Sequence, residues 1–349
     1  MTTYYVTTSG SDSNDGLTEG TAFATPGYAA SQATTAGDKV WVKSGTYTIT
    51  STTANVSGGA LSITDKVDFE GYETTIGDRA AKPLLDGNSL SGSTIVLLPN
   101  TARYGTTTQS FENFIVDGTS TWTYGVDGGG YIAIKKDLDV RNCVTGIRSA
   151  HLINCKTSNC TSSGMLNTNI VYNCFSDGDR IGIYSPSRSA MGCVVKDATY
   201  IGYRLGGYEA INCVAYNCVT GFTSASNQDI FCYKNLVAVN NTNLGFSNYY
   251  APIVQCATYN NGADYSNSTD GRFYDCVSLT ADPFNDPANN DFSLNSDAGG
   301  GELLKSRGFP HSLGVTTYWD VNAIQREVTA GGGGGGGTVS AIHPLRGTQ

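Results

Sequence analysis

Two acidic turns in the middle of the chain carry residues suited to chemistry. Asp177-Gly178-Asp179-Arg180 places two carboxylates and a guanidinium around one turn, and Asp197 follows 20 residues after Asp177. Carboxylates on neighbouring turns of a repeat could bind Ca²⁺ or serve as an acid/base pair. The alternative is an ordinary charged turn, in which Asp197 occupies a position suited to asparagine. The catalytic candidates are therefore Asp177, Asp179, Arg180 and Asp197.

A second group of oxygen donors lies near the N-terminus. Asp12, Asn14 and Asp15 precede Gly16, and closely spaced oxygen donors before a glycine are typical of small calcium loops. A tight Asx-turn explains the same residues without a metal, and we favour the turn. The sequence contains no Cys-x-x-Cys pair and only three scattered histidines, so no zinc-type site is indicated.

The ten cysteines are confined to residues 143–276. Seven of them form a series with gaps of 19 to 24 residues: Cys155, Cys174, Cys193, Cys213, Cys232, Cys256 and Cys276. An apolar residue lies two positions before each, which is the alternation of a strand with both residues facing inward. We therefore expect a stack of small buried side chains rather than reactive thiols. Neighbouring coils would bring such thiols within disulfide reach, so both the thiol and the disulfide state stay open.

Two further columns run in step with the cysteines. One consists of a glycine followed by an apolar residue, at Gly146, Gly164, Gly182, Gly202, Gly221 and Gly245. The other lies four residues after the cysteine, at Asn159, Gly178, Asp197, Asn217 and Asn260. Gly, Asn and Asp tolerate a left-handed backbone, so this column predicts one recurring turn. A period near 20 residues with strand alternation predicts a β-solenoid of about twelve coils between residues 39 and 280.

The second residue after each repeat glycine should point outward. These residues are Arg148, Leu166, Tyr184, Arg204, Thr223 and Ser247. Aromatic and cationic side chains on a flat sheet suit acidic sugars, through ring stacking and carboxylate pairing. The glycan-binding candidates are Arg148, Tyr184, Arg204 and Tyr208, with Tyr200 close by. Exposed tyrosines are also ordinary on a β-surface, and that is the alternative.

Composition limits the possible functions. Charged residues make up 15% of the 349, against about 25% in an average soluble domain, and the net charge is −9. No Lys/Arg cluster is present, which argues against a nucleic-acid partner. The longest aliphatic run, residues 95–98, is far shorter than a membrane span. The first residues show no secretory signal, so we expect synthesis in the cytoplasm.

The N-terminal motifs carry a family resemblance. Tyr4-Tyr5-Val6, the Gly10–Gly16 turn, the segment 37–42 and Gly45-Thr46-Tyr47-Thr48 together resemble the right-handed parallel β-helix superfamily, the pectate-lyase-like fold, over roughly residues 4–325. The resemblance implies an all-β solenoid with a short N-terminal capping helix. Thr25 and Pro26 suit the N-cap and first position of that helix, which we expect over residues 26–36. The expected divisions are 1–38 (strand and cap), 39–280 (β-helix), 281–328 (closing segment) and 329–349 (tether).

Activity follows less directly from this resemblance. Members of the superfamily include polysaccharide lyases, glycoside hydrolases and phage tailspikes, and their shared fold does not fix function. Neither the arginine motif of the lyases nor the paired aspartates of the hydrolases is found here. We therefore expect a structural or binding protein, a phage virion appendage that contacts surface glycans, without a cofactor or with Ca²⁺. The alternative is a lyase or hydrolase acting on an acidic polysaccharide. The resemblance further implies a homotrimer on a virion; a cytoplasmic or non-classically exported protein is the other possible location.

The C-terminal residues break the repeat. Seven glycines at 331–337 are typical of a flexible linker. Beyond them, Ile342, Pro344, Leu345 and Arg346 form a short apolar and basic end that would suit docking to other virion proteins. An inert disordered end is the alternative.

Overall fold

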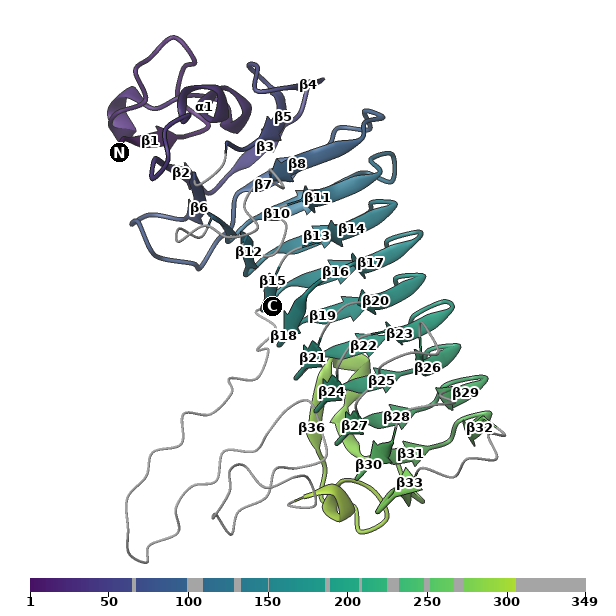
Figure 1. The fold of residues 1–349 in the computed structure, drawn as a ribbon. Coiled ribbons are helices and arrows are strands. Elements are labelled where there is room, and N and C mark those ends of the chain that lie inside the picture. The colour runs from purple at the N-terminus through teal and green to yellow at the C-terminus, as the bar shows by residue number, and fades with distance from the viewer. Residues whose placement is uncertain are drawn as a thin grey trace, which may run out of the picture.

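The computed structural model describes residues 1–64, 67–98, 109–128, 133–149, 151–185, 189–206, 209–224, 232–247, 252–266 and 273–305. Within them the chain coils into a parallel β-helix whose three long sheets run the length of the molecule (Figure 1). Each full coil adds one strand to sheet 1, then to sheet 2, then to sheet 3. The predicted all-β solenoid is confirmed.

The strands of each sheet follow one another in chain order. Sheet 1 contains β1 (Thr3–Val6), β2 (Lys39–Lys43), β6 (Asp68–Tyr72), β9 (Gln109–Glu112), β12 (Ala133–Lys136), β15 (His151–Ile153), β18 (Ile170–Tyr172), β21 (Ser189–Met191), β24 (Glu209–Ile211), β27 (Cys232–Lys234), β30 (Ile253–Val254) and β33 (Phe273–Tyr274). Sheet 2 contains β3 (Thr46–Thr48), β7 (Leu84–Asp86), β10 (Ile115–Asp117), β13 (Asp139–Arg141), β16 (Lys156–Ser158), β19 (Phe175–Asp177), β22 (Val194–Lys196), β25 (Val214–Tyr216), β28 (Val237–Val239), β31 (Ala257–Tyr259) and β34 (Val277–Ser278). Sheet 3 contains β4 (Ser51–Ala54), β5 (Gly59–Ser62), β8 (Thr94–Leu98), β11 (Tyr124–Gly128), β14 (Thr145–Arg148), β17 (Ser163–Leu166), β20 (Ile181–Ser185), β23 (Ile201–Leu205), β26 (Thr220–Ser224), β29 (Leu244–Ser247) and β32 (Ala263–Tyr265).

The coils are regular only in the second half of the solenoid. From β12 to β33 the strands of sheet 1 begin 18 to 23 residues apart, which gives seven turns of roughly 20 residues. Between β2, β6 and β9 the intervals are 29 and 41 residues. The longer N-terminal coils explain why the repeat is hard to recognise before Cys143.

Left-handed residues form the corners of each coil. Between sheets 2 and 3 the predicted turn column is confirmed, because Asn159, Gly178, Asp197, Asn217 and Asn260 all have positive φ. A second left-handed column, which was not predicted, lies between sheets 1 and 2, one residue before the cysteine of most coils and before Leu236 of one. Its members include Asn154, Asn173, Asn212 and Asn235, and neighbouring side chains are hydrogen-bonded, as where Asn173 donates to Asn154 at 2.8 Å.

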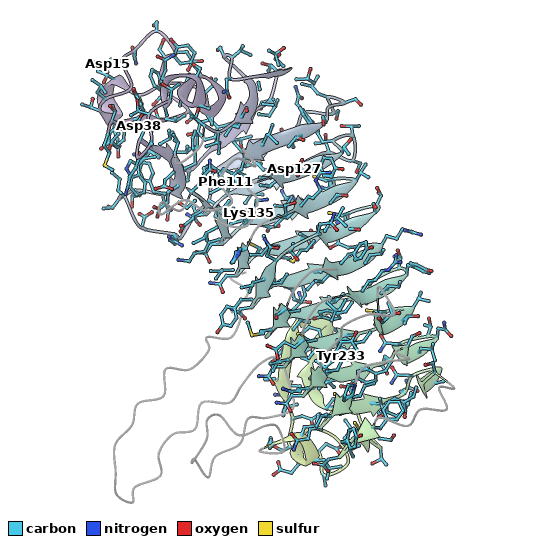
Figure 2. The ribbon with its side chains drawn as sticks, viewed as in Figure 1. Asp15, Asp38, Phe111, Asp127, Lys135 and Tyr233 are labelled. Carbon is cyan, nitrogen blue, oxygen red and sulfur yellow. The ribbon has the colours of Figure 1, made fainter. Side chains whose placement is uncertain are left out.

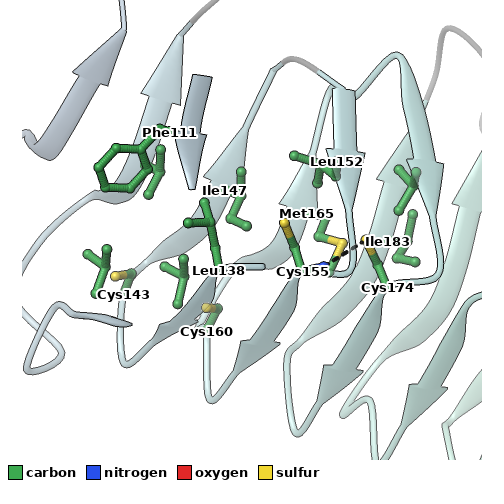
Figure 3. Close-up of a cluster of buried hydrophobic side chains, with 14 of the residues drawn as sticks. Phe111, Leu138, Cys143, Ile147, Leu152, Cys155, Cys160, Met165, Cys174 and Ile183 are labelled. Carbon is green, nitrogen blue, oxygen red and sulfur yellow. Dashed lines mark hydrogen bonds between the residues drawn. The ribbon is translucent and has the colours of Figure 1, made fainter. Parts of the chain in front are cut away.

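This second corner corrects two predictions about the cysteines. Cys155 and its counterparts are buried, but the apolar residue two positions earlier, Ile153, faces outward. The left-handed Asn154 between them turns the chain, so the inward partner is Leu152, three positions before the cysteine (Figure 3). Cys232 does not lie at the cysteine position of its coil. It begins β27, and Leu236 occupies the corner position at that coil.

The N-terminal end is covered as predicted, by a shorter helix. Thr25 caps α1 (Pro26–Gln32) by accepting a hydrogen bond from the Tyr28 amide, and Ala29 and Ala30 are buried against the first coils. The helix ends at residue 32 rather than 36. A 3₁₀ turn, η1 (Glu19–Thr21), precedes it.

The C-terminal segment folds back along sheet 2. Strands β35 (Phe284–Asp286) and β36 (Asp291–Leu294) form an antiparallel hairpin, joined by η2 (Pro287–Asn289) and followed by η3 (Gly301–Leu304). Phe284 and Phe292 pack with Tyr216 and with a row of outward-facing residues on sheet 2. That row consists of Phe175, Val194, Val214, Val237 and Ala257. In the described part of the chain, no helix is long and apolar enough to cross a membrane.

Candidate functional site

The outward ladder predicted on sheet 3 is present in the expected register. Arg148, Leu166, Tyr184, Arg204, Thr223 and Ser247 pair consecutively from β14 to β29. All six are half-buried on the outer surface, whereas the repeat glycines beside them are buried. A side chain at Gly202 would meet the Gly221 carbonyl at 2.7 Å, so glycine is required where the coils stack this closely.

Arg148 is occupied by its own neighbours. Its guanidinium donates to both carboxylate oxygens of Asp127 at 2.6 Å and to the Tyr124 hydroxyl at 2.8 Å, and it lies 4.0 Å from the centre of the Tyr124 ring. The Asp127 carboxylate raises the pKa of Arg148. Leu166 separates it from Tyr184 on the ladder. The structure therefore does not group Arg148 with the other glycan candidates. Its partner Asp127 is labelled in Figure 2.

Two arginine–tyrosine pairs connect the coil of β20 with the coil of β23. The Arg180 guanidinium lies 5.0 Å from the centre of the Tyr200 ring, and that of Arg204 lies 4.9 Å from the Tyr184 ring. Arg180 and Tyr184 belong to the coil of β20, and Tyr200 and Arg204 belong to the coil of β23. Among the described residues neither arginine has a carboxylate partner. Arg180 is exposed, and 48% of Tyr200 is exposed.

Asp179 is not available to form the predicted acidic pair. Its carboxylate is fully buried and accepts hydrogen bonds at 2.7 Å from the hydroxyls of Thr157 and Ser176 and from the amide of Cys160. Burial raises the pKa of Asp179 to about 6. The left-handed Gly178 turns the following residue into the interior, as the left-handed Asn159 does for Cys160. The prediction that Asp177 and Asp179 act together around one turn is therefore wrong.

Asp177 and Asp197 remain outside the core on neighbouring coils. Burial raises the pKa of Asp177, and the nearby charge of Asp197 contributes in the same direction. Lys196 lies between them in the structure. It pairs in register with Asp177, forms an ion pair of 3.8 Å with Asp197, and donates to the Ala288 carbonyl of the C-terminal hairpin.

The N-terminal oxygen donors are engaged with backbone groups of the chain itself. Asp12 accepts hydrogen bonds from the Ala24 and Thr25 amides at 2.9 and 3.0 Å, and Asp15 accepts one from the Leu17 amide at 3.0 Å. The Asn14 side chain donates to the Ala22 carbonyl. Only the Asp15 contact is that of an Asx-turn; Asp12 and Asn14 instead fasten this loop to residues 22–25. The described ranges contain no group of three or more His, Cys, Asp or Glu arranged to hold a metal.

Two charged features were not predicted from the sequence: an ion-pair cluster around Arg79 and the buried Lys135. Arg79 bridges Glu70, Glu112 and Asp137 over the outer surface of sheet 1, and burial raises the pKa of Glu70. Only the register reveals this, because Glu70 and Glu112 are 42 residues apart and pair on adjacent strands. Each carboxylate already has the guanidinium as partner, so the cluster fastens the loop before β7 to the sheet.

Lys135 is the second missed residue. It faces inward and is fully buried, and its ammonium donates to the carbonyls of Gly128, Arg148 and Ser149 at 2.7 to 3.0 Å (Figure 2). Burial lowers its pKa to about 7. Three carbonyl acceptors and no access to solvent indicate a structural tie between coils.

Several of the buried cysteines are free thiols, among them Cys143, Cys160 and Cys218. Burial raises the pKa of Cys143 and Cys218 to about 12. A buried thiol of high pKa is a poor nucleophile. Tyr208, Ile342, Pro344, Leu345 and Arg346, also named from the sequence, lie outside the described residues.

Comparison with known proteins identifies the fold. No protein-family model and no curated sequence matches this chain. The crystal structure of pectate lyase Pel9A superposes with a TM-score of 0.56 at 14% identity, covering 93% of this chain and 96% of that one. A rhamnogalacturonan lyase (17% identity, 74% of each chain) and open reading frame 18 of Geobacillus virus E2 (10%, 69% of this chain and 52% of that one) give 0.36 and 0.31, too low to carry an argument. The similarity shows the fold alone, and the chain has the pectate-lyase-like parallel β-helix.

Proposed function

We propose that this protein binds an acidic polysaccharide on the outer surface of sheet 3 and is carried as an appendage of a phage-type virion. The observation that carries this proposal is the pair of arginine–tyrosine contacts on β20 and β23. A guanidinium without a carboxylate partner can pair with the carboxylate of an acidic sugar, and a tyrosine ring offers a stacking surface.

The two pairs are arranged in opposite order on the two coils. Arg180 precedes Tyr184 by four residues on one strand, and Tyr200 precedes Arg204 by four on the next. At about 3.3 Å per residue the two pairs are about 13 Å apart along the strands. A polysaccharide lying along β20 and β23 would therefore meet a cation and an aromatic ring at each end of the strands.

The virion location is supported by three features of the chain. Cys143, Cys155 and Cys174 are free thiols inside the solenoid, as expected of a protein folded in a reducing compartment. The surface is poor in charge, and the glycine run at 331–337 would suit attachment of residues 338–349 to a partner. As a proposal, residues 342–346 provide that attachment.

The test is a binding titration with acidic and neutral polysaccharides of matched length. The double variant Arg180→Ala/Arg204→Ala should weaken binding to the acidic polymer by about tenfold or more, because two charge-assisted contacts are lost. The matched control is Arg141→Ala together with Lys156→Ala, which removes the same charge from sheet 2. Equal loss in both doubles, or equal binding of neutral polymer by the wild type, would overturn the proposal.

A second function is favoured by one observation, the raised pKa of Asp177 beside Asp197. A carboxyl group of raised pKa beside a second carboxyl group can serve as the acid in acid/base catalysis on polysaccharides. Under this alternative the protein is a depolymerase, either a lyase or a hydrolase, with or without Ca²⁺. Assay of the same polymers for shortened products separates the two functions. Cleavage that is lost in Asp177→Asn and kept in Asp286→Asn, an exposed aspartate of the hairpin, would establish the enzyme.

A further inference from the structure

A stripe of apolar side chains lies on the outer surface of sheet 1. It consists of Ile153, Tyr172, Met191 and Ile211, which pair in register on β15, β18, β21 and β24. We call these four residues the apolar stripe. They point away from the interior, because the residue before each is buried in the core.

The four residues of the apolar stripe are half-buried, and neither hydrophobic cluster of the described residues covers them. None of its four members belongs to, or packs against, either of the two hydrophobic clusters of the described chain. The corresponding apolar row on sheet 2 is covered by Phe284, Phe292 and Leu294 of the C-terminal hairpin. Contiguous apolar residues on an outer surface usually mark a place where another segment or protein binds.

Two lysines bracket the apolar stripe. Lys136, whose ammonium also lies 3.8 Å from the Glu112 carboxylate, precedes Ile153 in the same register column, and Lys234, which has an interaction of its own, follows Ile211. Five steps between adjacent strands separate the two lysines, which corresponds to about 24 Å at about 4.8 Å per step. A segment that covers the stripe along the solenoid axis would therefore gain from carboxylates spaced by a similar distance.

The chain beyond Lys305 contains such a segment. Asp320 and Glu327 are seven residues apart, which is about 23 Å in an extended backbone, and Val321 and Ile324 lie between them. Trp319 adds a large apolar side chain next to Asp320. We propose that residues 306–328 of the same chain lie along the apolar stripe, with Asp320 and Glu327 near the two lysines. A tethered segment binds at a high effective concentration, which favours it over a separate partner.

The experiment uses the fluorescence of Trp319 in the full-length protein. The contribution of Trp41 and Trp122 is removed by subtracting the spectrum of a Trp319→Phe variant. If the segment covers the stripe, Trp319 emits at short wavelength and is several-fold less quenched by acrylamide than free tryptophan. Met191→Glu, or Ile211→Glu should the first variant fold poorly, should shift the emission to long wavelength and restore quenching. Leu166→Glu on the outer surface of sheet 3 is the matched control and should leave both unchanged.

Three results would overturn this proposal. The first is an exposed Trp319 in the wild type. The second is a Trp319 that stays shielded in both stripe variants, since the segment would then be covered elsewhere. The third is a concentration-dependent dimer that Met191→Glu dissociates while Trp319 is exposed throughout, which would make a second copy of the chain the occupant of the stripe.

Discussion

The outer surfaces of sheets 2 and 3 differ although the same coils form both. From β19 to β31, sheet 2 presents Phe175, Val194, Val214, Val237 and Ala257, and the C-terminal hairpin covers them. Over the same coils sheet 3 presents Tyr184, Arg204, Thr223 and Ser247 on its outer surface. Both surfaces rest on the same interior of stacked cysteines, glycines and aromatic rings.

This difference between the two surfaces shows which positions the stacking of the coils does not constrain. Inward positions and corners are constrained by stacking at about 4.8 Å, whereas outward positions are constrained only by what lies against them. On sheet 2 that is another part of the chain, so the outward residues contribute to stability. On sheet 3, Tyr184 and Arg204 lie on the outer surface, are half-buried and contribute little to the core.

The largest loss of stability is expected where the C-terminal hairpin covers the outer surface of sheet 2. Phe292 is 1% exposed and contacts Phe175, Phe284 and Tyr216. Phe292→Ala should destabilise the hairpin by about 3 to 5 kcal/mol, because a large buried ring is lost and a cavity is left. Hydrogen exchange of the β36 amides measures this. Tyr200→Ala on sheet 3 is the comparison, and an equally large effect there would break the contrast between the two surfaces.

The interior beneath the candidate site offers the next test. Asp179→Ala leaves two hydroxyls and one amide without their acceptor, which should cost about 2 to 3 kcal/mol. Asp179→Asn should cost less, because Asn241 at the equivalent corner accepts a hydrogen bond from the Cys218 amide in the same way, at 3.0 Å. Chemical denaturation of the two variants compares them, and equal losses would show that the acceptor is unimportant.

The same residue predicts a pH dependence. Its pKa is raised from the ordinary value of 3.8 to about 6 in the folded state, so the folded protein holds this proton more tightly than the unfolded chain. Its contribution to stability is therefore greatest below pH 3.8 and falls as the pH rises through 6. The wild type minus Asp179→Asn difference in unfolding free energy isolates this term. A difference that grows in favour of the wild type between pH 4 and 6 would contradict the assignment.

Removal of the two arginines that we propose as ligand contacts should barely affect folding. Arg180→Ala and Arg204→Ala should each change stability by less than about 0.5 kcal/mol, because the groups are at the surface and have no described carboxylate partner. Thermal unfolding of each variant checks this beside the binding titration. A large loss would place these residues among the structural ones, like those of sheet 2.

The smallest effect on folding is expected from deletion of the tether, residues 329–349. Deletion of residues 329–349 should leave the unfolding curve unchanged and abolish incorporation into a particle, if this segment docks to a virion partner. Incorporation assays with the truncated and complete chains measure the second part. Normal incorporation of the truncated protein would exclude the docking role.

The sequence predicted the features that repeat. The glycine column, the turn column with Asn159 and Asp197, and the outward ladder with Tyr184 and Arg204 are confirmed. They were predictable because each coil stacks on the last and imposes the same requirement about every 20 residues. The predictions that were wrong depend on the backbone angle φ of a single corner residue. A left-handed corner at Asn154 or Gly178 reverses the direction of the next side chain, so Ile153 was predicted inside and Asp179 outside.

The amino-acid sequence by itself determined the solenoid, its period and the helix at its N-terminal end, because strand alternation, turn residues and capping residues act over short distances. Only the tertiary structure decided which charged and apolar residues meet. Arg79 joins carboxylates up to 58 residues away, and the C-terminal hairpin covers a row of sheet 2 that begins at Phe175. Such contacts depend on the register between distant coils and on loops of unequal length. Residue types and spacing along the chain do not contain that information.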